Sequence, residues 1–439
     1  MFSKPMFNES PLIIYLLLLS VVIAIYLFRR QRASQKASAI YAAAAEAGLI
    51  EPPSLHPLID PVECLGCGIC SIVCPEGNVI SIIRNKAVLI EPTHCIGHGA
   101  CAQACPTNAI SLVFGTEKRG VDIPFVGEDF QTNVPGLYIA GELGGMGLIR
   151  NAIEQGRQAM EAIRASLANK QSNHLDTFII GAGPAGFSAT LAAKKFGLDS
   201  VTVEQEALGG TVAHYPRGKL VMTTPVDLPI IGKVKLKDPS KEHLLEFWKT
   251  VEKKSGISIR YDERVTDIKS IQDGFEVHTT KSTYATKTVL LAIGRRGTPR
   301  KLDVPGEDLG KVVYRMIDPE QYAGRNVLIV GGGDSALEAA ADIGEQPGSK
   351  VILSYRNAAF SRARQRNRER IEKLCADGSI EVMMQSSVRK IAPDHIVIEQ
   401  KGEHHKAAND DVIICAGGIL PTMFLKSIGI EVDTKFGTV

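Results

Sequence analysis

The chain has 439 residues, of which 44% are hydrophobic and 22% are charged. This length and composition suit a globular protein of about three domains. The formal net charge of only +2 gives no bulk basicity, so we predict no nucleic-acid partner. Seven of the nine cysteines lie between Cys64 and Cys105. Reduced cysteines held so close together indicate a reducing compartment.

The first predicted element, residues 1–28, is an N-terminal segment with one transmembrane helix. Residues 11–28 contain no charge and are mostly Leu, Ile and Val, and at about 1.5 Å per residue they are just long enough to span a bilayer. Only Lys4 precedes this stretch, whereas four basic residues follow it at once: Arg29, Arg30, Arg32 and Lys36. The positive-inside rule then predicts a single-pass anchor of the inner membrane, with the rest of the chain on the cytoplasmic face. A cleaved signal peptide would have its charges before the apolar stretch.

Residues 29–56 are predicted to form a helical stalk and linker. Residues 34–49 are rich in alanine, which favours a helix. The pair Pro52-Pro53 then breaks it. The stalk is short, so it should keep the next segment near the membrane.

Residues 57–114 contain one cysteine spacing twice. The first copy is Cys64-x2-Cys67-x2-Cys70-x3-Cys74-Pro75, and the second is Cys95-x2-His98-x2-Cys101-x3-Cys105-Pro106. Three ligands at i, i+3 and i+6 can bind one cubane, and the fourth cysteine, before a proline, binds the other cluster. Zinc favours two separated cysteine pairs, and disulfides need an oxidising compartment. The spacing therefore predicts two iron–sulfur clusters.

This segment resembles the bacterial two-cluster ferredoxin module, a small α+β domain. The resemblance implies that cluster one is a 4Fe-4S cluster bound by Cys64, Cys67, Cys70 and Cys105. It also implies that Cys74, Cys95 and Cys101 bind cluster two. Two outcomes are open for His98: it ligates a second 4Fe-4S cluster, or it leaves a 3Fe-4S cluster.

Further along the chain, a glycine motif predicts a first dinucleotide site. A short apolar strand at residues 177–180 leads into Gly181-Ala182-Gly183-Pro184-Ala185-Gly186 and a helix, and the next strand ends at Glu204. The first glycine makes the turn, the second lets the backbone approach the pyrophosphate, and the third permits close helix packing. The helix N-terminus stabilises the phosphate charge, and Glu204 is expected to accept hydrogen bonds from the adenosine ribose.

A second copy of this pattern predicts an NADPH site. A strand at residues 327–330 precedes Gly331-Gly332-Gly333-Asp334-Ser335-Ala336 and a helix, and a further strand ends near Arg356. An arginine at this strand end accepts a 2′-phosphate, where an acid would repel it. We choose Arg356 and Arg362 for that role, and we assign about half of the arginines in the run from 362 to a solvated helix face. Strands that alternate with helices predict parallel sheets, hence an α/β fold with two Rossmann-like domains.

Residues 115–439 resemble the thioredoxin-reductase-like flavoproteins, in which an NAD(P)H domain interrupts an FAD domain. The resemblance rests on the second glycine loop, on residues 290–294, and on residues 136–142 with the Arg150-Asn151-Ala152 and Gln155-Gly156 that follow. It implies further FAD-binding residues: Gly141, Glu142, Arg150, Asn151, Ala152 and Gly294. The start of the helix near Asn151 would then face the flavin ring and stabilise negative charge there.

The order of these segments differs from that family, because the flavin-binding segment that ends the family's chains comes first here. We interpret this as a circular permutation. The FAD domain would comprise residues 115–170 as its displaced segment, 171–312 as its main part and 417–439 as its return, with the NAD(P)H domain at 313–416. Dithiol reductases of the family have Cys-x-x-Cys just before the second loop, where residues 313–319 contain no cysteine. Cys375 and Cys415 are isolated and suit packing, so the sequence argues against disulfide reduction.

These features together predict a membrane-anchored oxidoreductase that passes electrons from NADPH through FAD and two clusters. Its acceptor would be a membrane or protein carrier such as a quinone, a cytochrome or a ferredoxin-type protein, and the chain could form a homodimer. One alternative is the reverse direction, with NADP reduced by ferredoxin or a membrane carrier. An alternative of another class is a redox-sensing or assembly subunit that binds nucleotide without turnover.

Overall fold

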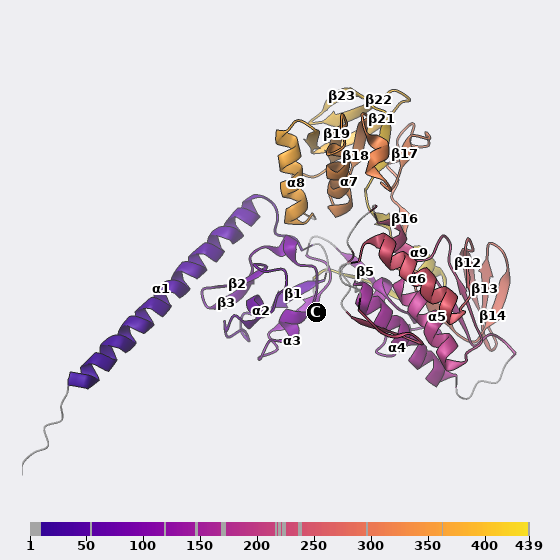
Figure 1. Cartoon of the computed structure of the whole chain (residues 1–439), viewed down its shortest axis with the longest axis horizontal. Helices are drawn as coiled ribbons and strands as arrows, with labels where there is room; N and C mark the ends of the chain where they lie inside the picture. Colours follow the sequence, from indigo (N-terminus) through magenta and orange to yellow (C-terminus); the bar gives the residue numbers. More distant parts are fainter. Residues whose placement is uncertain are drawn as a thin grey trace, which may run out of the picture. The chain divides into compact units, whose positions relative to one another are not determined.

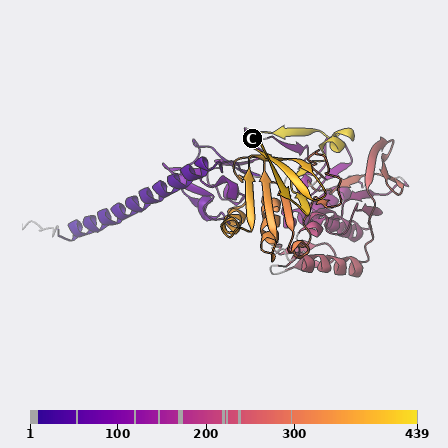
Figure 2. The same cartoon turned by 90° about the horizontal axis from the view of Figure 1, so that it is seen from above.

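The fold is taken from a computed structural model of the whole chain (Figure 1). The structure describes residues 10–52, 55–117, 120–144, 148–167, 173–215, 217, 221, 225–235, 239–295, 297–361 and 363–437. The chain divides into two compact units that meet in sequence between Val113 and Phe114. Figure 2 gives a second view of the same elements.

The first unit begins with one long helix, α1 (Ser10–Glu46). By length and composition α1 is a candidate membrane span, and it is the one such helix among the described residues. The candidate span and the stalk predicted after it therefore form one continuous helix, which ends before Pro52.

After α1 the chain forms a small domain of two antiparallel strand pairs and two short helices. Strand β1 (His56–Ile59) pairs with β4 (Ile110–Val113), so the two ends of the domain close on each other. Strand β2 (Ile80–Ile83) pairs with β3 (Lys86–Leu89) as a hairpin. The short helices are α2 (Ile69–Ile72) and α3 (Ala100–Gln103).

The C-terminal half of α1 packs on the hairpin of this domain. The Arg30 guanidinium donates a hydrogen bond to Asn85 Oδ1. The Arg84 backbone N–H donates to Ser34 Oγ at 3.3 Å, and Ala37 is only 3% exposed. Residues 30, 34 and 37 share one helix face, so the helix and the small domain form one body.

The second unit contains a five-stranded parallel sheet whose strands all lie between residues 137 and 291. Its strand order is β11-β8-β7-β15-β6. The strands are β6 (Leu137–Ile139), β7 (Thr177–Ile180), β8 (Ser200–Val203), β11 (Ile259–Arg260) and β15 (Val289–Leu291). Apolar side chains such as Phe178 are fully buried, as expected for a parallel sheet covered by helices.

The helices of this sheet are α4 (Ile149–Ser166), α5 (Pro184–Phe196) and α6 (Lys241–Ser255). Helices α4 and α5 approach closely, because a Cβ on Gly156 would lie 2.1 Å from the Ala185 carbonyl oxygen. Strand β6 pairs in parallel with β15, with Tyr138 opposite Leu290. Strand β6, which precedes the first glycine loop in sequence, thus belongs to the same sheet as β7, the strand that leads into that loop.

Smaller strands complete this part of the unit. Strands β12 (Val265–Ile271), β13 (Gly274–Thr279) and β14 (Thr283–Thr286) form an antiparallel sheet. Strand β9 (Val226–Leu228) pairs with β10 (Gly232–Val234), and β16 (Thr298–Pro299) pairs with β25 (Gly418–Ile419). After helix α9 (Thr422–Ser427), β26 (Val432–Lys435) pairs with β5 (Val121–Pro124). The C-terminal segment therefore returns beside the displaced one.

A second five-stranded parallel sheet has the order β17-β24-β18-β19-β20. Its strands are β17 (Val312–Val313), β18 (Asn326–Val330), β19 (Lys350–Tyr355), β20 (Ile380–Met384) and β24 (Asp411–Ile414). Helices α7 (Asp334–Gly344) and α8 (Gln365–Ala376) belong to it. Strands β21 (Ser386–Ile391), β22 (His395–Gln400) and β23 (Glu403–Ala408) form a separate antiparallel sheet. The chain thus has the two Rossmann-like sheets that the sequence predicts.

Candidate functional site

A large cavity lies at the carboxyl ends of the first parallel sheet. Its volume is about 750 Å³, within the range of small-molecule and cofactor sites. Five stretches of the chain contribute most of its lining: residues 140–142 with 148–152, residues 180–185, residues 203–215, residues 292–299 and residues 419–424. The displaced segment, the glycine loop and the C-terminal return thus surround one space.

The first glycine loop has the three positions that a dinucleotide requires. Gly181 has a φ of 104°, and a Cβ there would lie 2.6 Å from the Ala292 carbonyl oxygen. At Gly186 a Cβ would lie 1.8 Å from the Gly181 carbonyl oxygen, so only glycine permits this turn. At Gly183 the sole neighbour of a Cβ among the described residues would be Gly210 Cα at 4.0 Å. The backbone is therefore open toward the cavity at the position where a pyrophosphate should pass.

Glu204 directly follows strand β8 at the cavity wall and is only 7% exposed. Burial raises the pKa of its carboxyl group, while backbone hydrogen bonds act against that shift. The Ala182 N–H donates to Oε2 at 2.7 Å, and the Glu206 N–H donates to Oε1 at 3.1 Å. The loop backbone thus fixes this side chain beside the first glycine turn, where the ribose is expected.

The displaced segment places only some of its predicted residues at the cavity. Gly141, Glu142 and Ala152 line it, as do Pro184 and Gly294 from the other segments. Gly141 has a φ of 87°, and its N–H donates to Gln155 Oε1 at 2.8 Å. Its Cα lies so near helix α5 that a Cβ would be 2.9 Å from Ala185 Cβ.

Two predicted residues of this segment are not among those that line the cavity. Arg150 is exposed on the first turn of α4, and Asn151 is half-buried beside it. The neighbouring Ile149 and Ala152 point inward instead. The first turn of α4 thus lines the cavity with apolar side chains. Arg150 and Asn151 lie on another side of the helix.

Three polar residues that the sequence did not single out meet at the cavity. His214 Nε2 lies 2.6 Å from Glu206 Oε2, and Arg315 lies 3.4 Å from Glu206 Oε1. Arg315 also contacts His214 Nδ1. If Nδ1 accepts from the guanidinium, Nε2 holds the proton and donates it to Glu206. Arg315 follows β17, so this cluster joins the start of the second Rossmann-like domain to the cavity of the first.

The second glycine loop repeats the geometry of the first. At Gly331 a Cβ would lie 2.4 Å from the Cys415 carbonyl oxygen, whereas at Gly333 it would meet nothing within 4 Å. Ala336, at the third position, is fully buried, and Ser335 is exposed. The loop thus has an open second position at the start of a helix, as a dinucleotide requires.

Residues from outside this second loop contact it at two places, Gly332 and Asp334. The Tyr355 ring lies so near Gly332 that a Cβ there would be 2.3 Å from it, and it stacks on Phe360 at 5.5 Å. Asp334 Oδ1 accepts hydrogen bonds from Asn367 Nδ2 at 2.7 Å and from the Arg364 N–H at 2.8 Å. Its carboxylate therefore ties the start of α7 to the start of α8.

The arginines after β19 differ in whether they form ion pairs with acidic side chains. Arg356 is exposed directly after the strand and has no hydrogen bond or ion pair within the described part of the chain. Arg370, by contrast, lies 2.6 Å from Asp342 and 2.5 Å from Glu345, and Arg364 lies 3.6 Å from Asp334. Arg362 lies outside the described residues.

In the first unit, the four cysteines predicted for cluster one line one small cavity. Cys64, Cys67, Cys70 and Cys105 all contribute to it. Burial raises the pKa of the Cys70 thiol to about 11, and the neighbouring Cys64 and Cys67 add to that shift. As thiolates, these side chains would need a positive charge beside them, which bound iron would supply.

The loop around His98 has the same backbone as the loop around Cys67. Gly66 and Gly68 have φ values of 67° and 82°, and Gly97 and Gly99 both have 78°. His98 therefore occupies the position that Cys67 has in the first loop. Its Nε2 lies 3.7 Å from Glu76 Oε1.

The remaining predicted ligands of cluster two also lie near one another. Burial raises the pKa of the Cys95 thiol to about 11, with further contributions from the nearby Cys101 and Cys74. Among the described residues, no group of three or more His, Cys, Asp or Glu side chains is placed to hold a single metal ion.

Comparison with known proteins identifies the family. Residues 178–438, more than half of the chain, match the model of the pyridine nucleotide-disulphide oxidoreductase family. Residues 56–106 match the model of the 4Fe-4S dicluster domain. The chain belongs to the pyridine nucleotide-disulphide oxidoreductases and contains a 4Fe-4S dicluster domain as well.

Its relatives include reductases of two named kinds. The chain is 27% identical to bacilliredoxin reductase Bdr of Bacillus subtilis, over 59% of this chain and 82% of that protein. It is 27% identical to a ferredoxin–NADP reductase of Ignicoccus hospitalis, over 59% of this chain and 83% of that protein. Among solved structures, bacillithiol disulfide reductase Bdr of Staphylococcus aureus matches with a TM-score of 0.52 and 27% identity, over 58% of this chain and 80% of that chain.

These findings define an FAD-dependent NAD(P)H oxidoreductase with an iron–sulfur domain. The family match starts at residue 178 and so leaves out β6 and α4. Strand β6 nevertheless pairs with β15, and α4 packs against α5, both within the part of the chain that the match covers.

Proposed function

We propose that this protein is a membrane-anchored, NADPH-dependent oxidoreductase that passes electrons from NADPH through FAD and two clusters to a membrane or protein acceptor. The observation that supports this most directly is the pair of glycine loops with the same open second position, at Gly183 and Gly333. The same chain has a cavity lined by four cysteines. One polypeptide thus has a place for a hydride donor, a flavin and one-electron carriers.

In this proposal the first cavity holds FAD. The open backbone at Gly183 approaches the pyrophosphate, and Glu204 accepts hydrogen bonds from the adenosine ribose. Residues 292–294 and the start of α4 line the part of the cavity left for the flavin ring. FAD would supply the conversion of a two-electron hydride into single electrons.

The second loop would bind NADPH in preference to NADH. Arg356 supports this, because it follows β19 directly and is exposed without an acidic partner among the described residues. A 2′-phosphate there would gain charge-assisted hydrogen bonds from the guanidinium.

We further propose that residues 115–170 are a circularly permuted part of the FAD domain. Supporting this, β6 pairs with β15, α4 packs against α5, and Gly141 contacts the first loop. Strand β5 of the same segment pairs with β26 near the end of the chain. In this arrangement the flavin-binding segment also connects the FAD domain directly to the dicluster domain in sequence.

For the clusters, we propose Cys64, Cys67, Cys70 and Cys105 as ligands of a 4Fe-4S cluster. Cys74, Cys95 and Cys101 would bind the second, with His98 as its fourth ligand or with three irons only. The matching loop backbones favour His98 as a ligand, because its side chain starts from the same position as that of Cys67.

The acceptor is proposed to lie at the membrane. Ala37, which packs against the hairpin side of the dicluster domain, is nine residues beyond Phe28, the last of the uncharged residues. At 1.5 Å per residue this is roughly 14 Å along the helix axis. If α1 spans a bilayer, the dicluster domain is then held at its surface, where a quinone or a membrane-bound carrier could be reached.

Ferredoxin–NADP reductases among the relatives favour a second candidate function, electron transfer in the opposite direction. In that case a ferredoxin-type protein or a membrane carrier would donate electrons and NADP would be reduced. The direction depends on cluster potentials, which span about −700 to +450 mV across proteins. Both directions use the same sites.

The disulfide reductases among the relatives raise a third activity, which we propose this chain lacks. Residues 313–319, just before the second loop, contain no cysteine. The first glycine loop contains none either, and Ala185 stands there. Cys375 and Cys415 are far apart in sequence and each is partly buried. We expect purified protein to show no NADPH-dependent reduction of bacillithiol disulfide above a flavin-free control.

The decisive test is an anaerobic NADPH titration of the purified protein, followed by absorbance and EPR together. We expect NADPH to bleach the flavin and then to produce the EPR signal of reduced clusters. Bleaching without cluster reduction would favour the opposite direction. Bound FAD with no reduction and no steady-state turnover of an artificial acceptor would favour the redox-sensing or assembly subunit.

A further inference from the structure

Beyond its apolar stretch, helix α1 has two opposite faces with different surroundings. One face, at residues 30, 34 and 37, packs on the β2–β3 hairpin through the contacts of Arg30, Ser34 and Ala37. Because a helix has 3.6 residues per turn, residues 25, 32 and 36 lie on the far side of it, and residue 29 lies on its flank. That side is exposed along its whole length.

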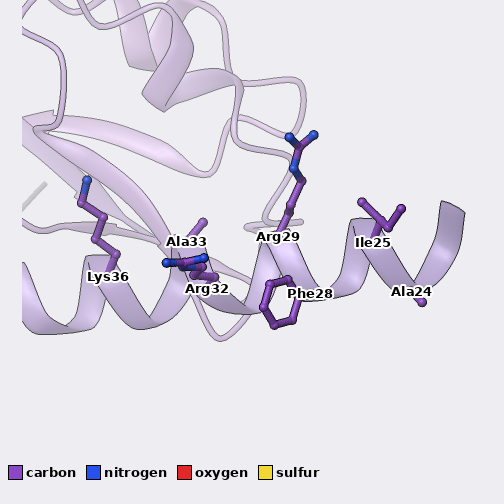
Figure 3. A pocket seen from close by; sticks show the side chains of 7 residues that line it. All are labelled: Ala24, Ile25, Phe28, Arg29, Arg32, Ala33 and Lys36. Atoms are coloured by element: carbon purple, nitrogen blue, oxygen red, sulfur yellow. The ribbon is translucent and has the colours of Figure 1, made fainter. Parts of the chain in front are cut away.

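The far side forms a shallow pocket with an apolar and a basic end. It is lined by Ala24, Ile25, Phe28, Arg29, Arg32, Ala33 and Lys36. In Figure 3, Arg29 and Lys36 extend to the same side of the helix, while Phe28 points to the other side. The apolar side chains come from the end of the uncharged stretch and the basic ones from the first turns after it.

The three basic side chains of this pocket have no counter-charge. Arg29, Arg32 and Lys36 form no hydrogen bond or ion pair within the described part of the chain. Arg30, between them in sequence, is already engaged by Asn85. Three exposed positive charges on less than three turns of helix repel one another unless an anion lies among them.

We propose that this pocket binds the phosphate headgroup of an anionic phospholipid. Arg29, Arg32 and Lys36 would hold the phosphate, and Ile25 and Phe28 would contact the start of an acyl chain. The inference rests on the proposed membrane anchor, because only that anchor places residues 28 and 29 at the boundary between hydrocarbon and headgroups. The apolar end of the pocket favours an amphiphilic ligand over free phosphate.

The test uses full-length protein with the triple change Arg29→Gln, Arg32→Gln and Lys36→Gln. Detergent-solubilised protein is titrated with phosphatidylglycerol or phosphatidylcholine, and bound lipid is counted by native mass spectrometry. We expect the wild type to prefer phosphatidylglycerol and the triple variant to bind it roughly tenfold or more weakly, since each basic side chain near anionic lipid contributes to binding. The matched control is Lys249→Gln, Lys253→Gln and Lys254→Gln on the exposed face of α6, which should bind like the wild type.

A separate measurement distinguishes failure of this site from failure of the anchor. Membranes that contain each variant are washed with alkaline carbonate, and the protein that stays with the membrane is measured. The lipid site alone is overturned if the wild type, the triple variant and the α6 control all stay with the membrane and the wild type shows no lipid preference. It is also overturned if all three stay and the α6 control loses as much phosphatidylglycerol binding as the triple variant. Release of the wild type overturns the anchor and the site with it. Displacement of the lipid by millimolar inorganic phosphate would show a plain anion site and also overturn the proposal.

Discussion

Two alanine substitutions in the first glycine loop should separate folding stability from FAD binding. Gly186→Ala should lower the free energy of unfolding, whereas Gly183→Ala should keep it and weaken FAD binding. At Gly186 the new Cβ would lie 1.8 Å from the Gly181 carbonyl oxygen, so backbone must shift. Such overpacking costs about 1–3 kcal/mol or more of folding free energy. At Gly183 the Cβ meets only Gly210 Cα at 4.0 Å, and the backbone φ of −71° suits alanine. Gly183→Ala should therefore leave the stability of the flavin-free protein unchanged or slightly higher.

The effect of Gly183→Ala appears only when FAD is present. The methyl group would occupy the open space through which the pyrophosphate passes, and it would cost at least one charge-assisted hydrogen bond from the loop. That loss is worth about 1.5–3 kcal/mol, or roughly 10- to 150-fold in FAD affinity. Affinity is measured by flavin fluorescence on titration of the stripped protein, and stability by urea unfolding of the same sample.

The matched control for this pair is Gly333→Ala in the second loop. A Cβ at Gly333 also meets nothing within 4 Å, so this variant should fold and bind FAD normally but bind NADPH weakly. The reasoning is refuted if Gly183→Ala loses as much stability as Gly186→Ala, or if its FAD affinity equals that of the wild type.

Three further predictions concern the other sites. Arg356→Ala should weaken NADPH binding by about tenfold or more and leave NADH binding unchanged; equal losses in calorimetric titrations would show that Arg356 is structural. Because histidine ligation raises cluster potentials, His98→Cys should give a second four-iron cluster of lower potential in an EPR redox titration, and an unchanged second cluster would exclude His98 as a ligand. Gly156→Ala should lower the stability of the FAD fold by about 1–3 kcal/mol, since its Cβ would lie 2.1 Å from the Ala185 carbonyl oxygen; a neutral result in urea unfolding would argue against a shared fold for α4 and α5.

The parts of this protein that the sequence predicts well are those defined by local spacing. Cys64, Cys67 and Cys70 come together because a short loop with glycines at positive φ can place them so. Gly181 and Gly186 need no distant information either, since the strand, turn and helix are contiguous. The proposed permutation also rests on local spacing, because residues 136–142 keep a recognisable pattern wherever they stand in the chain.

The parts that the sequence does not predict depend on contacts between distant residues. Arg315 reaches Glu206 and His214 across about 100 positions, and no motif marks any of the three. Tyr355 lies against Gly332 only because β18 and β19 are neighbours in the second sheet. The packing of α1 on the hairpin likewise depends on Asn85, a turn residue with no pattern to distinguish it.

Helix orientation accounts for the remaining difference from expectation. Arg150 and Asn151 were expected at the flavin because they begin a helix in a recognised segment. In the structure Ala152, which was expected there too, lines the cavity together with Ile149, whereas Arg150 and Asn151 are not among the lining residues. A motif gives the position of a helix start, but a rotation of one residue, about 100°, decides which side chain faces the site.

The central claim is that electrons leave the flavin through the clusters, and removal of one cluster-one ligand tests it most directly. Cys67 is an exposed member of the four-cysteine cavity, so Cys67→Ala should damage cluster one with little effect on the rest of the fold. The measurement is NADPH-dependent reduction of a one-electron membrane acceptor, with stopped-flow reduction of the flavin by NADPH in the same samples and Cys375→Ala as the matched cysteine control. We expect Cys67→Ala to reduce its flavin at the wild-type rate and to lose delivery to the acceptor, while Cys375→Ala keeps both. Wild-type delivery by Cys67→Ala would contradict the account and would make the clusters structural.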